Sequence, residues 1–239
     1  MGYFGDCNSC AFVFYLDRAS DERRAFFFYA SLAAAAKQRI ALACHLLFAE
    51  KMAHLILASS SPRRNELLSQ LGLTFDIYSP DIDESILHGE TAAVYVERLA
   101  RMKAKAVQVR FPDAVIVAAD TSLGVDGRIL GKPESKQHAF EIWAQISGRK
   151  HDVFSGVCVR TKEQICSIVV RTQVEFQVLS LRDMEDYWAT GEPLGKAGAY
   201  AIQGIAARYI PRIDGSYSNV VGLPLHETAQ LLQAVKALN

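Results

Sequence analysis

The sequence predicts an α/β fold in which a mixed β-sheet is flanked by helices. From residue 54 onward, short apolar runs of strand length alternate with segments whose apolar residues recur at helical spacing. Turn and capping residues separate these segments. Half of all residues are hydrophobic and 22% are charged, which is typical of a globular protein with a substantial core. Strands and helices that alternate in this way favour the α/β class.

The first elements are a strand and two helices. Residues 55–58 are an apolar run of strand length. Ser61, followed by a proline, is typical of a helix start, and Gly72 of a helix end. Thr91 is expected to begin the second helix. Its core face would carry four residues at helical spacing, namely Tyr95, Leu99, Met102 and Ala106.

A buried strand and a hairpin follow. Residues 115–119 are apolar throughout, and the strand they predict ends at Asp120. Asp126 and the glycine after it are typical of a two-residue hairpin turn. They would join residues 123–125 to residues 128–130.

The second half predicts one more helix, two paired strands and a capped helix. Residues 135–147 have four apolar side chains on one face, Ala139, Ile142, Trp143 and Ile146. Residues 153–160 and 165–179 are expected to pair as strands. Ser180 and the acid three residues later resemble a capping box, and the helix should end near Gly191.

The last part of the chain predicts a glycine-rich segment, a strand and a closing helix. The glycine-rich segment covers residues 195–204, and residues 206–213 are expected to form the strand. Pro224 would begin the closing helix, whose apolar face includes Leu231, Leu232, Val235 and Leu238.

Residues 1–51 do not share this pattern, so the predicted domain covers residues 52–239. Charged residues interrupt the apolar clusters of the first segment, and no run approaches the roughly 18–20 residues of a membrane span. One interpretation is an N-terminal extension of unknown role, translated from a start upstream of Met52. The other is an anchor or partner helix.

Charge and cysteine content narrow the class of protein. Lys+Arg and Asp+Glu both number 26, whereas a general nucleic-acid binder usually shows a basic excess. An anionic ligand would therefore have to be held by local charge. The five cysteines form no visible paired framework, which favours a reduced, cytoplasmic compartment. We expect neither nucleic acid nor a membrane as a partner.

The first candidate for chemistry is the turn at residues 59–64, which reads SSSPRR. Free N–H groups at a helix start bind anions, and the serine hydroxyls add donors. Arginines in a first helical turn oppose the helix dipole, so their presence there favours an anion ligand. The serine alone would indicate no more than a helix cap.

The second candidate is Asp120, followed by Thr121. An acid at the carboxyl end of a buried strand lies where α/β sheets place their ligands. Asp120 could hold a divalent metal, deprotonate a water, or do both. The residue type alone leaves a simple turn acid as an equal alternative.

Lysines and a second acid could complete a phosphate site. Lys103, Lys132 and Lys196 are point charges of the kind that phosphate chemistry needs, although each alone is usually a surface residue. Glu84 offers a second carboxylate. In residues 196–204, small residues would let a ligand approach the backbone, and Gln203 can both donate and accept hydrogen bonds.

These segments together resemble the Maf family of nucleoside triphosphate pyrophosphatases, also called septum formation inhibitor proteins. The motifs occur in the family's order and span the chain from Met52 to its end. They are ASSSPRR at 58–64, PDIDE at 80–84, RLARMKA at 98–104, ADT at 119–121, GKP at 131–133, KAGAY at 196–200 with IQG at 202–204, and GSY at 215–217 with VVGLP at 220–224.

The resemblance implies an elongated α/β protein with two lobes and a central cleft, often a homodimer. It also implies an enzyme of nucleotide-pool housekeeping. The reaction would hydrolyse a nucleoside triphosphate to the monophosphate and pyrophosphate with a divalent cation, Mg²⁺ or Mn²⁺. The KAGAY and IQG motifs are similar to the branch that prefers dTTP and UTP, and modified pyrimidine nucleotides are further candidate substrates.

The same resemblance implies residue roles. Asp120 would be the proton acceptor that activates water and, with Glu84, a metal-binding residue. Arg63, Thr121 and Gln203 would match positions that set base specificity. Ser59, Arg64, Lys103 and Lys132 would match residues that bind phosphate or metal.

The sequence departs from the family pattern at two places, and both concern the base pocket rather than catalysis. Gly195 stands where the family often has an acid, and Ala206-Ala207 where two glycines are frequent. A competing function is a nucleotide-binding regulator of cell division that needs no turnover. A nucleic-acid-binding module is the weakest alternative, because the net charge is zero.

Overall fold

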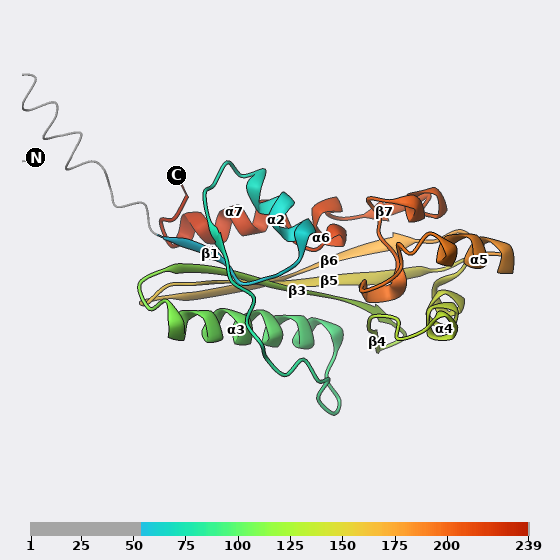
Figure 1. The fold of residues 1–239 in the computed structure, drawn as a ribbon, viewed down its shortest axis with the longest axis horizontal. Coiled ribbons are helices and arrows are strands. Elements are labelled where there is room, and N and C mark those ends of the chain that lie inside the picture. The colour runs from blue at the N-terminus through green and yellow to red at the C-terminus, as the bar shows by residue number, and fades with distance from the viewer. Residues whose placement is uncertain (1–53, 239) are drawn as a thin grey trace, which may run out of the picture. The chain divides into compact units, whose positions relative to one another are not determined.

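A mixed seven-stranded sheet forms the centre of the fold in a computed structural model that describes residues 54–238 (Figure 1). The interpretations given to residues 1–51 lie outside the described residues. The strand order is β2-β1-β3-β5-β6-β7, with β4 also paired to β3. In chain order the elements are β1 (Leu55–Leu57), α2 (Pro62–Ser69), β2 (Asp76–Ile77), α3 (Ala92–Arg110), β3 (Val115–Val125), β4 (Arg128–Leu130), α4 (Lys136–Ile146), β5 (Lys150–Arg160), β6 (Ile165–Glu175), α5 (Leu181–Ala189), the 3-10 turns η1 (Ala197–Ala199) and η2 (Ile205–Tyr209), β7 (Arg212–Asp214), α6 (Tyr217–Val221) and α7 (Leu225–Ala234).

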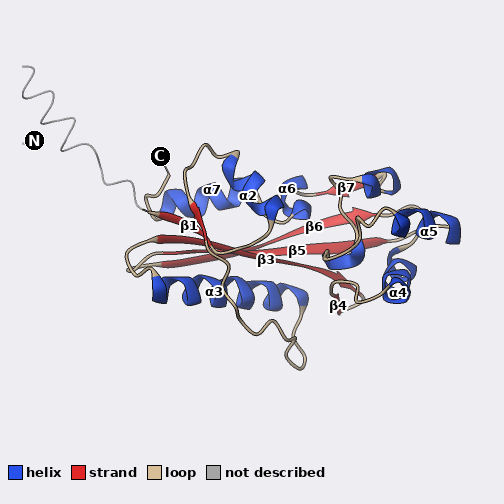
Figure 2. Ribbon diagram, in the orientation of Figure 1, coloured by secondary structure: helices blue, strands red, loops and turns tan. Residues whose placement is uncertain are grey.

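Parallel and antiparallel pairs divide the sheet. β1 runs parallel to both β2 and β3, whereas β3, β5, β6 and β7 pair antiparallel in that order. The three strands β3, β5 and β6 each have eleven residues. They extend from the end of the sheet beside α3 and α7 to the end beside α4 and α5 (Figure 2). α3 covers one face of the sheet, and α2, α6 and α7 lie over the other (Figure 1).

The buried apolar residues form three clusters, which divide the fold into two lobes. Two clusters lie on opposite faces of one half of the sheet, because alternate residues of β1 and β3 point to opposite sides. Val115 and Val117 belong to one of these clusters, and Ile116 and Ala118 to the other. The third cluster fills the far end, where α4 and α5 pack around Trp143 and Tyr187.

The backbone of α3 packs directly against the sheet at Gly156 of β5. A Cβ atom at this position would lie 2.4 Å from the backbone oxygen of Val96 in α3. Only a glycine lets the helix backbone come so near the strand. This contact brings the buried face of α3, which carries Lys103, against the middle of the sheet.

Several predicted elements are confirmed. The hairpin between β3 and β4 turns at Asp126 and Gly127, both with positive φ. α4 buries all four of its predicted core residues. Ser180 and Asp183 form the capping box of α5. No helix in the described residues has the length and apolar character to cross a bilayer.

The predicted end of the strand at Asp120 is wrong. β3 continues to Val125 and keeps its antiparallel register with β5 throughout. Asp120 and Thr121 interrupt the apolar run in the sequence. Both side chains nevertheless find polar partners inside the fold, so the ladder continues through them.

The strand predicted at residues 206–213 is also wrong. The 3-10 turn η2 occupies residues 205–209, and β7 covers only residues 212–214. Two amides of η2 are bound by the side chain of Glu192. These amides are therefore unavailable to a β-ladder, and the contact spans a sequence separation that local patterns cannot reveal.

Smaller differences concern helix faces and ends. The buried face of α3 includes Val96, Ala100 and Val107 rather than Tyr95, Met102 and Ala106. Leu99 is buried as predicted. β6 and α7 are shorter than predicted, and β2 and α6 were not predicted.

Candidate active site

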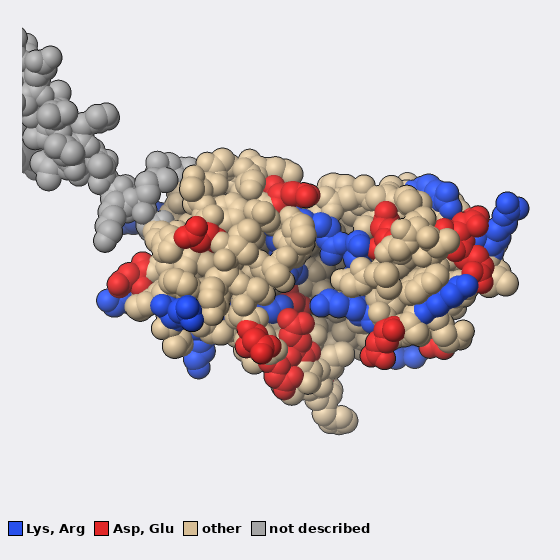
Figure 3. All heavy atoms as spheres, in the orientation of Figure 1, with Lys and Arg blue, Asp and Glu red and all other residues tan. Residues whose placement is uncertain are grey.

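A cavity of about 1000 Å³ opens where the edge of β3 has no neighbouring strand. β1 pairs with β3 up to Val117, and β4 pairs with it again from Leu123. The intervening residues of β3 have no strand partner on this side. Figure 3 shows Lys and Arg side chains gathered around a hollow in the middle of the visible face, with acidic side chains along one rim. Five cations and four acids line the cavity: Arg63, Arg64, Lys103, Lys132, Lys196, Glu84, Asp120, Glu134 and Glu192.

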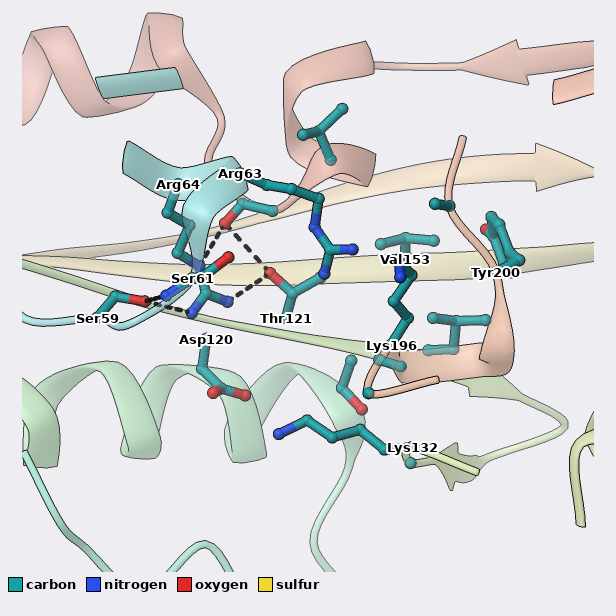
Figure 4. Close-up of a pocket in the computed structure, with 18 of the residues that line it drawn as sticks. Ser59, Ser61, Arg63, Arg64, Asp120, Thr121, Lys132, Val153, Lys196 and Tyr200 are labelled. Atoms are coloured by element: carbon teal, nitrogen blue, oxygen red, sulfur yellow. Dashed lines mark hydrogen bonds between the residues drawn. The ribbon is translucent and has the colours of Figure 1, made fainter. Parts of the chain in front are cut away.

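Asp120 and Thr121 lie in the gap between β1 and β4 and point to opposite sides of β3. Asp120 faces α3, where its Oδ1 accepts a hydrogen bond from Lys103 Nζ at 2.7 Å. Thr121 faces α2 and α6, and its Oγ1 lies 2.8 Å from Ser155 Oγ. The strand alternation therefore places an acid and a hydroxyl on either side of the open edge (Figure 4).

Lys103 joins two carboxylates. Its Nζ lies 2.7 Å from Asp120 Oδ1 and 2.7 Å from Glu84 Oε1. Partial burial opposes the charge on Glu84, but hydrogen bonding and attraction from Lys103 hold the pKa of Glu84 below its usual range. Nearby Tyr95 has its pKa raised to about 12, by burial and then by the negative charge of Asp120. The local field thus combines a buried cation with two acids.

The two carboxylates also fit a divalent cation that is completed by substrate oxygens. Among residues 54–238, no group of three or more His, Cys, Asp or Glu side chains could hold a metal alone. Mg²⁺, however, is usually held by one or two carboxylates together with waters and phosphate oxygens. Asp120 and Glu84 each contact the ammonium of Lys103 through one oxygen, so a divalent cation would be held by their remaining oxygens.

The start of α2 leaves backbone N–H groups free to donate, because the cap expected from the side chain of Ser61 is not formed. Ser61 occupies the N-cap position, yet its side chain makes no capping hydrogen bond. Instead, the backbone N–H of Ser61 donates to Ser59 Oγ at 3.2 Å. The first turn of α2 contains no acid, so the positive end of the helix dipole is not neutralised there. This end of the cavity is suited to an anion.

The two adjacent arginines lie in different environments. Arg64 donates from Nε to the Gly222 carbonyl at 2.9 Å, and from its terminal nitrogens to Ser59 and Thr121. Burial removes water from both guanidinium groups and thereby lowers the pKa of each arginine. Arg63 Nε is buried and has no hydrogen-bond partner in the described part of the chain. Its guanidinium points along the cavity toward Val153 (Figure 4).

The remaining predicted residues line the cavity from the other lobe and its rim. Lys132 follows β4 and extends toward Asp120 (Figure 4). Lys196 and Gln203 belong to the segment after α5. Burial, and then the positive charge of Arg63, lower the pKa of Lys196. All the residues singled out in the sequence therefore line a single cavity.

Sequence reasoning missed three polar residues that shape this cavity. Ser155 holds Thr121, and Asn219 accepts from Ser155 through its backbone carbonyl. Glu192 lines the cavity and binds backbone amides of η2. Ser155 and Asn219 carry no local signal, because their roles depend on contacts more than 30 positions away. For Glu192, the acid directly after the helix end at Gly191 was a weak signal.

The fold and this cavity define a class: an α/β protein with an acid at an open strand edge, surrounded by cations that suit a phosphate-rich small molecule. The family model for Maf-like proteins matches residues 54–235. The chain therefore belongs to the Maf-like protein family.

Relatives of the chain share one name. A dTTP/UTP pyrophosphatase from Acinetobacter baylyi is 68% identical over 183 residues, covering 77% of this chain and all of that protein. One from Pseudoalteromonas atlantica is 50% identical, covering 74% of this chain and 95% of that protein. Among solved structures, the Ham1 protein of Staphylococcus aureus is 13% identical with a TM-score of 0.38, covering 52% of this chain and 71% of that one. The sequence relatives carry the family assignment.

Proposed function

We propose that this chain is a nucleoside triphosphate pyrophosphatase that hydrolyses dTTP and UTP to the monophosphate and pyrophosphate, with Mg²⁺ or Mn²⁺. The observation that carries the proposal is Asp120, a largely buried acid at an open strand edge within a cavity of cations. The names of the relatives supply the substrate class. The cavity volume suits a ligand of nucleotide size.

The proposed reaction is water attack at the α-phosphorus. Asp120 accepts a proton as the water oxygen bonds to phosphorus, and the bond between phosphorus and the bridging oxygen breaks. Pyrophosphate leaves with the electron pair. Lys103 occupies Asp120 Oδ1, and Oδ2 has no hydrogen-bond partner among the described residues, so it is the oxygen available for the proton.

The phosphates would lie against the cationic end of the cavity. The uncapped start of α2 and Ser59 offer neutral donors, whereas Lys132 offers a charge that offsets the leaving pyrophosphate. A divalent cation held by Asp120 and Glu84 would supply further charge to the phosphate oxygens. Positioning and charge stabilisation account for most catalysis of phosphoryl transfer.

The base would lie toward Gln203, Lys196 and Arg63. The Watson–Crick edge of uracil or thymine presents a donor between two carbonyl acceptors. Gln203 can donate and accept at once, and both cations can donate to a carbonyl oxygen. In cytosine an amino group replaces one of these carbonyls. That amino group is a donor, and it would face a cation that cannot accept a hydrogen bond. This arrangement supports a preference for dTTP and UTP over dCTP.

The decisive experiment measures pyrophosphate release from dTTP and UTP with Mg²⁺, in the wild type and in Asp120→Asn. We expect the substitution to lower kcat about 100-fold or more, because the proton acceptor is lost while the side-chain shape is kept. Circular dichroism should show an unchanged fold. The matched control is Asp113→Asn, an acid whose side chain is 83% exposed and pairs with Lys162 at the surface.

Two outcomes would contradict the proposal. Near-normal turnover in Asp120→Asn would exclude this acid as the proton acceptor. A wild type that binds dTTP but releases no pyrophosphate would instead indicate a nucleotide-binding regulator.

A further inference from the structure

Glu192 lies between the end of α5 and the cavity, and its carboxylate binds the backbone of η2. Ile205 N–H donates to Glu192 Oε2 at 2.8 Å, and Ala206 N–H donates to Oε1 at 3.2 Å. The phenol of Tyr187, in the last turn of α5, donates to the same Oε1 at 2.6 Å. One carboxylate therefore accepts three hydrogen bonds from two separate parts of the chain.

Tyr187 extends this contact to the other side of Gln203. Ala201 N–H donates to the Tyr187 hydroxyl at 3.2 Å. The backbone is thus held two residues before Gln203 by the phenol, and two and three residues after it by the carboxylate. The pair Glu192 and Tyr187 encloses the short turn that carries Gln203 into the cavity.

The turn fits the carboxylate so closely that a side chain at position 204 would displace the carboxylate of Glu192. A Cβ atom on Gly204 would lie 2.0 Å from Glu192 Oε2. Gly204 has φ −113° and ψ −146°, outside the left-handed region, so the effect of a side chain here would come from the close approach of Glu192 and not from the backbone conformation. The position of Gln203 is therefore coupled to that of the acid.

Glu192 also fixes a second base-facing group. Its backbone carbonyl accepts a hydrogen bond from Lys196 Nζ, and the Leu194 carbonyl lies 3.4 Å from the same nitrogen. Lys196 points into the cavity in Figure 4. One residue thus orients the ammonium of Lys196 through its backbone and the turn of Gln203 through its side chain.

The partners of Glu192 are anchored in the far lobe. The Tyr187 ring is 2% exposed and packs against Trp143 and Tyr209, with centroids 5.3 and 5.8 Å away. Burial of Glu192 opposes its charge, but the hydrogen bonds from Tyr187 and the two amides hold its pKa below the usual range. A charged acceptor that is hydrogen-bonded to a packed helical residue is a rigid support for a recognition turn.

We propose that Glu192 and Tyr187 are positioning residues that set the pyrimidine preference of the enzyme by fixing Gln203 and Lys196. The inference rests on the proposed function. Neither residue need touch the substrate, because each acts through the backbone around Gln203. The phosphate end of the cavity and Asp120 belong to other elements, so the pair should affect recognition of the base much more than the chemical step.

The test compares Glu192→Gln and Tyr187→Phe with the wild type on dTTP, UTP and dCTP. We expect KM for dTTP to rise about tenfold and the dTTP-to-dCTP ratio of kcat/KM to fall by a similar factor. We expect kcat to stay within about threefold. Gln203→Ala supplies the reference, because it removes the group that the pair is proposed to position.

Matched controls come from the same lobe. Glu185→Gln changes an acid of α5 that pairs with Lys136 at the surface. Tyr209→Phe removes a hydroxyl from a ring that packs on Tyr187 but hydrogen-bonds outside the turn. Both controls should keep the wild-type ratio. If Glu192 and Tyr187 had only a structural role, their substitution would lower the free energy of unfolding and leave the dTTP-to-dCTP ratio of kcat/KM unchanged.

Dissociation constants for dTTP and dCTP, measured in EDTA, test the positioning role of Glu192 and Tyr187 separately from the proposed pyrophosphatase function. A wild type without turnover would overturn the proposed function, while the binding ratio of the variants would still decide the positioning role. Equal losses for all three nucleotides, or a fall in kcat at constant KM, would overturn the positioning role alone.

Discussion

Asp120 and Thr121 are adjacent in the sequence and yet face different helices. Asp120 meets Lys103 of α3, whereas Thr121 meets Arg64 of α2. This division follows from the two-residue period of a strand and needs no irregular backbone. The sequence alone could rank both as polar residues after an apolar run. It could not show that the strand continues through them and that the edge beside them lies open.

His151 is a buried histidine whose titration should make stability depend on pH. It is 3% exposed, and its Nε2 lies 2.8 Å from the Tyr200 hydroxyl. Burial lowers the pKa of His151 from 6.5 to about 4, although Asp152 partly opposes the shift. The unfolded chain therefore binds a proton between these values and the folded chain does not. This contribution to stability is present above pH 6.5 and is lost as the pH falls toward about 4.

We expect this one group to lower the free energy of unfolding by about 2 kcal/mol between pH 7 and pH 5. Urea unfolding of the wild type and His151→Gln at both values measures the difference in slope. Glutamine can still hydrogen-bond Tyr200 but does not titrate. The control is His226→Gln, at an exposed position of α7, which should keep the wild-type slope. Equal slopes for wild type and His151→Gln would contradict the prediction.

At the scale of elements, the contact between α3 and β5 determines where Lys103 lies. The space for a Cβ atom at Gly156 is already filled by backbone atoms of Val96 and Glu97. Gly156→Ala should therefore push α3 away from the sheet and lower the free energy of unfolding by about 2–3 kcal/mol. Because α3 carries Lys103, turnover should fall as well. Urea unfolding and pyrophosphate release measure the two effects.

The stability control for this substitution is Gly131→Ala. A Cβ atom at Gly131 would meet nothing within 4 Å, and its φ is not positive. Its unfolding free energy should stay within about 0.5 kcal/mol of the wild type. If Gly156→Ala were as stable as this control, the close packing of α3 on β5 would not be what holds the helix in place.

Elements with local signals were predictable from sequence, and elements fixed by distant contacts were not. Thr91, Ser135 and Ser180 each cap a helix through their own side chains, and all three helix starts were predicted. η2 was mistaken for a strand because its amides bind Glu192, thirteen and fourteen positions earlier. The candidate site was found through ordered motifs. The support of Gln203 by Tyr187 was not, because it is purely three-dimensional.

At the scale of the whole molecule, the cavity draws its lining from both lobes and from most of the described chain. Residues 58–64 belong to one lobe and Tyr200 to the core of the other, whereas Ile202 packs in the core of the first lobe. β3, β5 and β6 pass continuously through both. A nucleotide that spans the cavity would therefore contact groups whose correct placement needs the entire sheet.

This arrangement predicts that a nucleotide stabilises the fold as a whole. A dTTP analogue with a methylene bridge between the α- and β-phosphates, at about 100 times its Kd, should add about 2.7 kcal/mol to the stability of the folded state. For a chain of this size, that corresponds to a rise in Tm of about 5–10 °C. The control is inorganic triphosphate at the same concentration, which can occupy only the phosphate end and should raise Tm less. Differential scanning calorimetry measures both, and equal shifts for the two ligands would mean that the base makes no contact with the second lobe.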